Sequence, residues 1–164
     1  MTLEQAQFIS QSLGVFTTRV GIFVNQPLAW VKEIASALRL QAIQLHGQED
    51  AAYAKALAND FFIIKAVSFH EHLDPESLQD FPAEALLLDG LKPGSGEVFD
   101  WTVAKAWKGH PKLILAGGLT PENVSRSIEA LNPYAVDTAS GVEASVGIKD
   151  HQKIQDFVRA AKDF

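Results

Sequence analysis

The chain has 164 residues, of which 47% are hydrophobic and 21% charged, and its formal net charge is −6. This composition is ordinary for a single globular domain, and the acidic balance argues against a nucleic-acid binder, which needs a basic face. No apolar run is long enough to span a membrane and no signal peptide opens the chain, so we expect a cytoplasmic protein without a membrane partner.

The hydrophobic pattern predicts helices and strands that alternate along the chain. A helix opens it at 2–13, because apolar residues recur there at helical spacing from Leu3 to Leu13. Short runs rich in apolar residues then predict strands at 19–25, 42–46, 61–69, 85–89, 112–116 and 134–137. A helix is predicted after each of them, at 28–38, 51–59, 75–79, 99–107, 121–131 and 150–162.

The predicted strands are apolar almost throughout, as in the Ala-Leu-Leu-Leu-Asp run at 85–89, and do not alternate with polar residues. Both faces of such strands must be buried, which is typical of a parallel sheet covered by helices. The strict alternation favours an α/β fold, either a doubly wound open sheet or a closed barrel. A full eight-unit barrel takes about 250 residues, and compact ones about 200, so a chain of this length is too short for eight units. No linker or second domain is visible, and we predict one domain over residues 1–164.

Two loops of small residues follow the last two predicted strands. The first contains Gly117 and Gly118, and the second contains Ser140 and Gly141. Either loop alone would most simply be a tight turn. Together, on consecutive strands, such loops form the phosphate site of many barrels, where backbone N–H groups bind the anion. We therefore predict that these four residues bind a phosphorylated small molecule.

Three polar residues end other predicted strands, where parallel α/β folds bind their ligands. Asp89 is a candidate general acid or base because apolar surroundings favour the neutral form of a carboxyl group; the alternative is a helix cap or a rim charge. His46 either contacts substrate or forms a hydrogen bond beside a tight turn. Asp137 either orients a substrate donor or fixes the turn that follows it.

The chain has no cysteine, which excludes a disulfide, a thiolate metal site and a cysteine nucleophile. The histidines other than His46 show no metal-ligand spacing. We therefore expect no metal site.

A series of short segments carries a resemblance that covers essentially the whole chain. In one-letter code they read VGIFVN at 20–25, QLHG at 44–47, LLLD at 86–89, GSG at 94–96, LAGGL at 115–119, SGVE at 140–143 and GIKD at 147–150. In this order and spacing they resemble the phosphoribosylanthranilate isomerases of tryptophan biosynthesis.

The resemblance implies a TIM-type (β/α) barrel and an Amadori rearrangement of N-(5′-phosphoribosyl)anthranilate that uses no metal or cofactor. Asp89 matches the family's general acid, which protonates the furanose ring oxygen. The glycine pair at 117–118 and the Ser140–Gly141 pair match its phosphate cradle, and Asp137 matches a residue near the anthranilate amine.

This sequence departs from the family at its start. The family's general base is a cysteine in a Lys-Ile-Cys-Gly motif on its first strand, and no such motif is present here. The opening helix resembles the family's second helix, so the first strand, first helix and second strand have no counterpart. We therefore expect a barrel truncated at its N-terminal side to about six strand–helix units, with weak or no activity.

Two other interpretations stay open. The chain could be a non-catalytic module that binds a phosphate or a partner, and its open strand edges at 20–24 and 135–137 would then favour a homo-oligomer or completion by another chain. A neighbouring phosphate-binding barrel enzyme is the weakest alternative. An indoleglycerol-phosphate synthase would need Lys65 and a matching glutamate at a strand end, and a sugar-phosphate epimerase would need metal ligands.

Overall fold

The computed structural model describes residues 1–70, 73–90, 101–110 and 112–163. The chain falls into two compact units: unit 1 contains Met1–Ala66 and Asp80–Ala85, and unit 2 contains Val67–Gln79 and Leu86–Phe164. Each unit has its own hydrophobic core. The Gly-Ser-Gly segment at 94–96 lies outside the described residues, and the single domain predicted for residues 1–164 stays a prediction.

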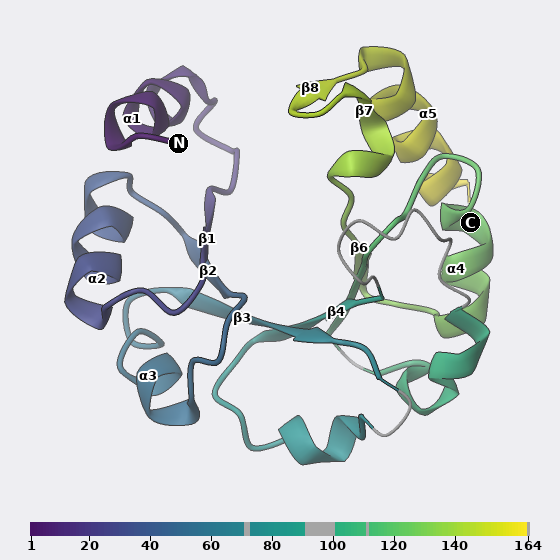
Figure 1. Cartoon of the computed structure of the whole chain (residues 1–164), viewed down its shortest axis with the longest axis horizontal. Helices are drawn as coiled ribbons and strands as arrows, with labels where there is room; N and C mark the ends of the chain where they lie inside the picture. Colours follow the sequence, from purple (N-terminus) through teal and green to yellow (C-terminus); the bar gives the residue numbers. More distant parts are fainter. Residues whose placement is uncertain (71–72, 91–100, 111, 164) are drawn as a thin grey trace. The chain divides into compact units, whose positions relative to one another are not determined.

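The strands of the main sheet follow one another in chain order, and every register described between them is parallel. They are β1 (Val20–Phe23), β2 (Ala42–Leu45), β3 (Phe62–Ser68), β4 (Ala85–Asp89), β5 (Leu113–Ala116) and β6 (Ala135–Val136). Figure 1 shows how helices alternate with these strands along the chain. The α/β fold with parallel strands is therefore confirmed, as is the position of each predicted strand.

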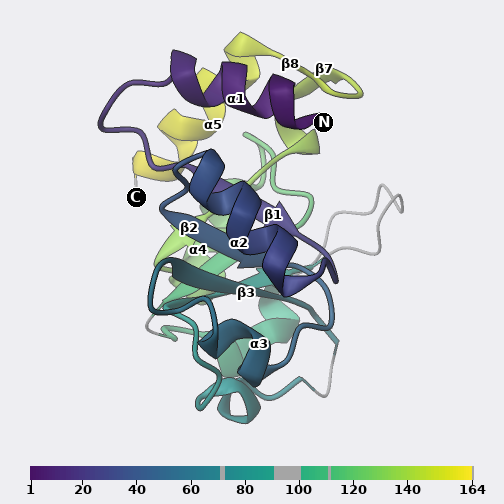
Figure 2. The same cartoon turned by 90° about the vertical axis from the view of Figure 1, so that its left-hand side faces the viewer.

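The helices of unit 1 are α1 (Leu3–Ser12), α2 (Leu28–Ala37) and α3 (Ala51–Lys55). Figure 2 shows α2 and α3 on one side of β1, β2 and β3. All four residues of β2 are buried, the polar Gln44 included, as expected for a strand covered on both faces. Its Ile43 and Leu45 pack with Val31 of α2 in the core. In contrast, α1 is held at its start by a capping box on Thr2 but buries none of its residues.

Unit 2 contains several short elements and two longer helices. They are η1 (Pro75–Leu78), η2 (Trp101–Trp107), α4 (Val124–Leu131), η3 (Ser140–Val142), β7 (Glu143–Ser145), β8 (Ile148–Lys149) and α5 (His151–Lys162). Its core places Leu88 of β4 and Leu115 of β5 with Trp107, Leu131 and Phe157. None of the helices that the structure describes is long and apolar enough to cross a membrane.

The structure corrects several predicted boundaries. The helix predicted at 121–131 begins at Val124, because the Asn123 side chain first accepts a hydrogen bond from the backbone N–H of Thr120 and closes a turn. Within the range predicted as a helix at 99–107, the described residues form a 3-10 helix with a kink at Ala104. The helix predicted at 51–59 ends at Lys55, and the β7–β8 pair was not predicted.

Candidate active site

Asp89 is the last residue of β4, and sheet pairing fixes its position. Its register partner is Ala116, the last residue of β5, and its carbonyl oxygen accepts a hydrogen bond from the Phe69 N–H at 2.8 Å. The N–H of Gly90 donates to the Ala116 carbonyl at 3.3 Å. Leu86, Leu87 and Leu88 before it are buried, whereas Asp89 is half-buried. Its carboxyl group therefore starts from the C-terminal edge of the sheet, beside the first loop.

The first loop is held in shape by its glycines and by one asparagine. Gly117 and Gly118 have φ angles of 86° and 66°, in the left-handed region that glycine adopts without strain. The Asn123 side chain donates to the Gly118 carbonyl at 2.9 Å and accepts from the Thr120 N–H at 2.8 Å. These two bonds hold both ends of the turn, and Leu119 between them is buried.

The second loop packs directly against the first through the carbonyl oxygen of Leu119. The Thr138 hydroxyl donates to this oxygen at 2.6 Å. A Cβ atom on Gly141 would overlap the same oxygen, so the approach of the two loops requires glycine at 141. The N–H of Asp137 donates to the Leu115 carbonyl at 2.8 Å and ties the start of the loop to β5.

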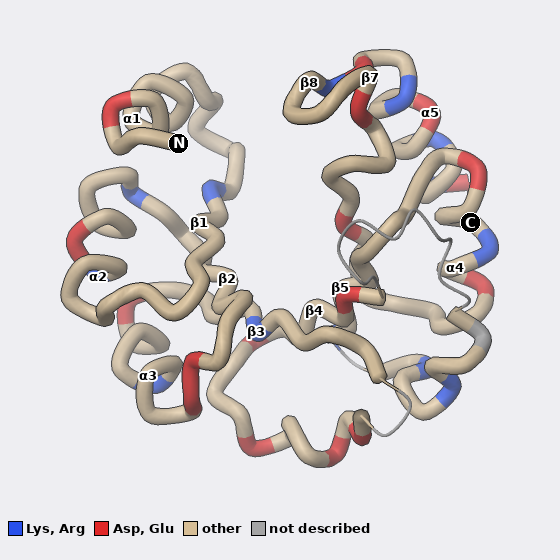
Figure 3. Tube along the Cα trace, in the orientation of Figure 1, with Lys and Arg blue, Asp and Glu red and all other residues tan. Residues whose placement is uncertain are grey.

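Lysine side chains hold the far side of the second loop. Lys149 donates to the Ala139 carbonyl at 2.7 Å and to the Glu143 carboxylate at 2.8 Å, and Lys153 donates to the Glu143 carbonyl at 2.9 Å. The hydrogen bond from Lys149 lowers the pKa of Glu143, which stays charged. Figure 3 shows charges of both signs around β7, β8 and α5. The loop that contains Ser140 and Gly141 is thus fixed on both sides.

These supporting residues were not among the predicted site residues. The Asn123 and Thr138 side chains donate hydrogen bonds to backbone carbonyls of the first loop. Lys149 donates to the carbonyl of Ala139, ten residues before it. The position of Asn123 three residues after Thr120 is a turn signal that could have indicated its role. No local pattern indicates the contact between Thr138 and Leu119.

His46 is the one predicted site residue that belongs to unit 1, whereas Asp89, Gly117, Gly118, Asp137, Ser140 and Gly141 all belong to unit 2. It follows β2, and its N–H donates to the Phe23 carbonyl of β1 at 2.9 Å. Its ring Nδ1 lies 2.9 Å from the side-chain nitrogen of the buried Gln44. Gln44 thereby fixes the orientation of the imidazole at the C-terminal end of β2.

A buried ion pair supports the turn after His46. Glu49 accepts hydrogen bonds from the Asn25 N–H at 2.6 Å and the Gly47 N–H at 2.9 Å, and Lys65 lies 3.3 Å from its carboxylate. Burial alone would raise the pKa of Glu49, but these N–H groups and Lys65 together lower it. Glu49 therefore remains a carboxylate that joins the turns after β1 and β2.

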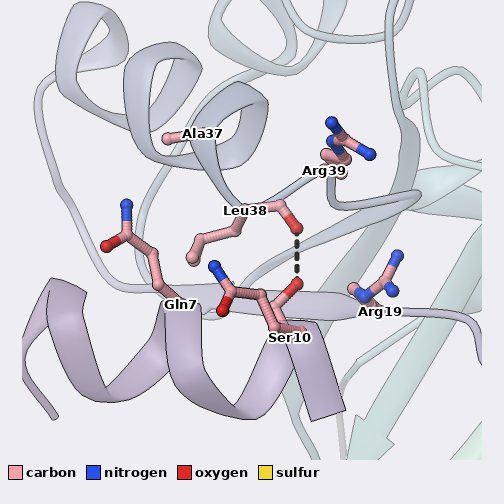
Figure 4. Close-up of a pocket in the computed structure, with 7 residues that line it drawn as sticks. Gln7, Ser10, Arg19, Ala37, Leu38 and Arg39 are labelled. Atoms are coloured by element: carbon pink, nitrogen blue, oxygen red, sulfur yellow. Dashed lines mark hydrogen bonds between the residues drawn. The ribbon is translucent and has the colours of Figure 1, made fainter. Parts of the chain in front are cut away.

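A pocket of about 400 Å³ in unit 1 contains none of the predicted site residues. It lies between α1 and the end of α2, where the Ser10 hydroxyl donates to the Leu38 carbonyl at 2.9 Å (Figure 4). Arg19 and Arg39 are among its lining residues. Throughout the described part of the chain, no three His, Asp or Glu side chains are grouped so that they could bind a metal ion.

Comparison with known proteins places the chain in a family. Residues 1–160 match the family model of N-(5′-phosphoribosyl)anthranilate (PRA) isomerase. The N-(5′-phosphoribosyl)anthranilate isomerase of Thermotoga neapolitana is 42% identical over 163 residues, which are 97% of this chain and 80% of that protein. The chain thus spans about four-fifths of this relative.

Two solved structures of such isomerases superpose on the whole chain. One, in complex with reduced 1-(o-carboxyphenylamino)-1-deoxyribulose 5-phosphate, has a TM-score of 0.84, 35% identity and coverage of 100% of this chain and 81% of its own. The other, described as monomers generated from a dimeric isomerase of Thermotoga maritima, has a TM-score of 0.87, 36% identity and coverage of 100% and 81%. They confirm the TIM-type barrel implied by the resemblance. The chain therefore belongs to the N-(5′-phosphoribosyl)anthranilate isomerases, enzymes of tryptophan biosynthesis.

Proposed function

We propose that the chain binds N-(5′-phosphoribosyl)anthranilate at the C-terminal ends of β4, β5 and β6 and carries the acid step of its Amadori rearrangement. One observation carries this proposal: the two loops after β5 and β6 meet at the Leu119 carbonyl, and Asp89 ends the strand next to β5. A phosphate held by the loops would bring the sugar of the substrate to the carboxyl group of Asp89.

In the proposed reaction the carboxyl group of Asp89 donates a proton to the furanose ring oxygen. The C1–O bond breaks, the ring opens, and the anilino nitrogen forms a protonated Schiff base with C1. A base then removes the C2 proton, and the resulting enolamine tautomerises to the 1-amino-1-deoxy ketose. The reaction is an isomerisation, so one proton enters and one leaves and no cofactor is consumed.

The residues of the two loops have distinct roles in this proposal. Backbone N–H groups around the Gly117–Gly118 and Ser140–Gly141 pairs and the Ser140 hydroxyl bind the phosphate oxygens. Asp137, at the exposed start of the second loop, accepts a hydrogen bond from the anthranilate amine. The contact of His46 with substrate stays a prediction from the sequence.

Removal of the C2 proton is the step for which the chain has no candidate base. The family's cysteine base has no counterpart in a sequence without cysteine. Loss of a general base typically removes a contribution of about 10²- to 10⁴-fold. We therefore expect binding of the substrate with slow turnover.

The experiment combines a binding assay with a turnover assay. The purified chain is titrated with reduced 1-(o-carboxyphenylamino)-1-deoxyribulose 5-phosphate, an analogue that cannot react, and its turnover of the substrate is followed. We expect Asp89→Asn to keep the affinity for the analogue within about threefold and to abolish the remaining turnover, because the amide cannot donate the acidic proton. Turnover that survives this substitution would contradict the role of Asp89.

A non-catalytic phosphate-binding module is the second candidate, and the missing cysteine favours it. It would bind the analogue in the same way but show no turnover above the uncatalysed rate. The cytoplasmic location and the self-association expected from the sequence stay predictions.

A further inference from the structure

The charged side chain of Lys149 bonds to both ends of the short turn that contains Ser140 and Gly141. Its Nζ donates to the Ala139 carbonyl, just before η3, at 2.7 Å. The same Nζ donates to the Glu143 carboxylate, just after η3, at 2.8 Å. A single ammonium group thus joins the two ends of η3.

The sequence after η3 brings Lys149 back to this position. The strands β7 and β8 pair antiparallel with Glu143 and Lys149 as register partners, and Gly147 takes a φ angle of 79° in the turn between them. Opposite charges on directly paired residues attract each other. The next residue, Asp150, donates its N–H to the Val142 carbonyl at 2.8 Å, and its side chain caps α5. Lys149 therefore lies between two fixed points of the backbone.

The ion pair between Lys149 and Glu143 is partly open to water. The two side chains are 41% and 18% exposed. Ion pairs with this degree of exposure contribute little to the stability of a fold. Stability alone therefore gives little reason for a charge at position 149, and this favours a role of Lys149 in the loop itself.

The carbonyl that Lys149 binds belongs to the same peptide group as the N–H of Ser140. A trans peptide group is planar, so its C=O and N–H bonds point in opposite directions. Because Lys149 holds the oxygen of this group, the Ser140 N–H is directed away from the lysine. A positive charge at the carbonyl end also polarises the peptide group, which makes its N–H a stronger hydrogen-bond donor.

We propose that Lys149 is a positioning residue for phosphate binding. Through the Ala139 carbonyl it sets the direction and the donor strength of the Ser140 N–H, without contact with the ligand. The first N–H of a helix has no acceptor within that helix, and Ser140 is the first residue of η3. A phosphate oxygen is a suitable external acceptor. This inference rests on the proposed function, since it takes the phosphate of N-(5′-phosphoribosyl)anthranilate as the ligand of the loop.

Direct binding of phosphate by Lys149 is the alternative, and the contacts of its ammonium group argue against it. Two of its three hydrogens are already directed at the Ala139 carbonyl and the Glu143 carboxylate. The hydrogen bond from Lys149 lowers the pKa of Glu143, so this carboxylate is charged near neutrality. Its negative charge beside the ammonium group would repel a phosphate dianion. The geometry therefore favours action through the peptide group.

The first test compares variants in their affinity for reduced 1-(o-carboxyphenylamino)-1-deoxyribulose 5-phosphate. We expect Lys149→Met, which removes the charge but keeps an unbranched side chain, to weaken binding about tenfold. Lys149→Arg retains a charged donor and should bind within about threefold of the parent. Lys162→Met changes the net charge equally at an exposed site in the last turn of α5, and should bind like the parent. Parent affinity in Lys149→Met, or equal losses in the two methionine variants, would overturn the proposal.

A measurement without ligand separates this inference from the proposed function. Amide NMR spectra of the free chain report the environment of the Ser140 N–H. We expect Lys149→Met to move the Ser140 amide proton to higher field, because the peptide group loses its polarisation, whereas Lys149→Arg and Lys162→Met leave it in place. An unchanged Ser140 resonance in Lys149→Met would overturn the inference alone. A parent chain that does not bind the analogue would contradict the proposed function and, with it, the role of Lys149 in phosphate binding.

Discussion

The ammonium group of Lys65 donates a hydrogen bond to the carbonyl oxygen of Gly47 at 2.7 Å. A lysine on β3 thus closes the turn that follows β2. Both Lys65 and its ion-pair partner Glu49 are buried, with 6% and 7% of their surfaces exposed. Removal of one partner would leave the other as an uncompensated buried charge.

The first prediction follows from this arrangement. We expect Glu49→Gln to lower the free energy of unfolding by about 3 kcal/mol, the low end for breaking a buried ion pair, because glutamine can still accept one hydrogen bond. Urea denaturation measures the change. The double variant Glu49→Gln with Lys65→Met is the control, since it removes both charges and should be less destabilised than the single variant. A single variant as stable as the parent would contradict the structural role of Glu49.

The stabilisation by Glu49 should depend on pH. The pKa of Glu49 is lowered from 4.5 in the folded chain, so the unfolded chain binds the proton more readily. The contribution of Glu49 is therefore complete above about pH 4.5 and is lost as the pH falls through the lower folded value. We expect the stability difference between the parent and Glu49→Gln to be constant near neutrality and to shrink below pH 4.5. A difference that grows on acidification would contradict this assignment.

The strands of the main sheet could be predicted because each one is indicated by a pattern within its own short sequence. Runs such as Leu86 to Leu88 are apolar on both faces, and this pattern is typical of a buried parallel strand. The start of α4 could not be predicted in this way, since residues 120–123 form a turn that is closed by a hydrogen bond from the Thr120 N–H to the Asn123 side chain. The short strands β7 and β8 consist largely of exposed residues and so lack an apolar signal.

The predicted site residues were located from their strand ends and loops, whereas the contacts that hold them were not foreseen. Lys65 and Glu49 are 16 residues apart, and Thr138 and Leu119 are 19 apart. No periodicity or turn signal connects such residues. Their pairing depends on which strands become neighbours, which is a property of the folded sheet.

The contact between the two loops gives a third prediction. We expect Gly141→Ala to weaken binding of the reduced deoxyribulose phosphate analogue at least tenfold, because the added Cβ would overlap the Leu119 carbonyl oxygen and push the loops apart. Calorimetric titration measures the affinity. Gly14→Ala is the matched control, since a Cβ there meets nothing closer than the Thr17 hydroxyl at 3.8 Å. Equal affinities of the two variants would contradict the proposed cradle.

The hydroxyl of Thr138 provides a fourth prediction. We expect Thr138→Val to weaken binding of the same analogue severalfold, since it removes the 2.6 Å hydrogen bond to the Leu119 carbonyl while it keeps the volume of the side chain. Thr138→Ser retains the hydroxyl and should bind like the parent. If both variants bind alike, the hydrogen bond does not position the loop.

We propose that the loops after β5 and β6 bind the phosphate and that Asp89 acts as the acid, while the sequence contains no cysteine to act as the family's base. The most direct test compares its kcat/KM for N-(5′-phosphoribosyl)anthranilate with that of the Thermotoga neapolitana isomerase under the same conditions. We predict a value about 10²- to 10⁴-fold lower, consistent with a missing general base, together with saturable binding of the reduced analogue. Turnover within tenfold of the relative, or no binding of the analogue at all, would contradict the claim.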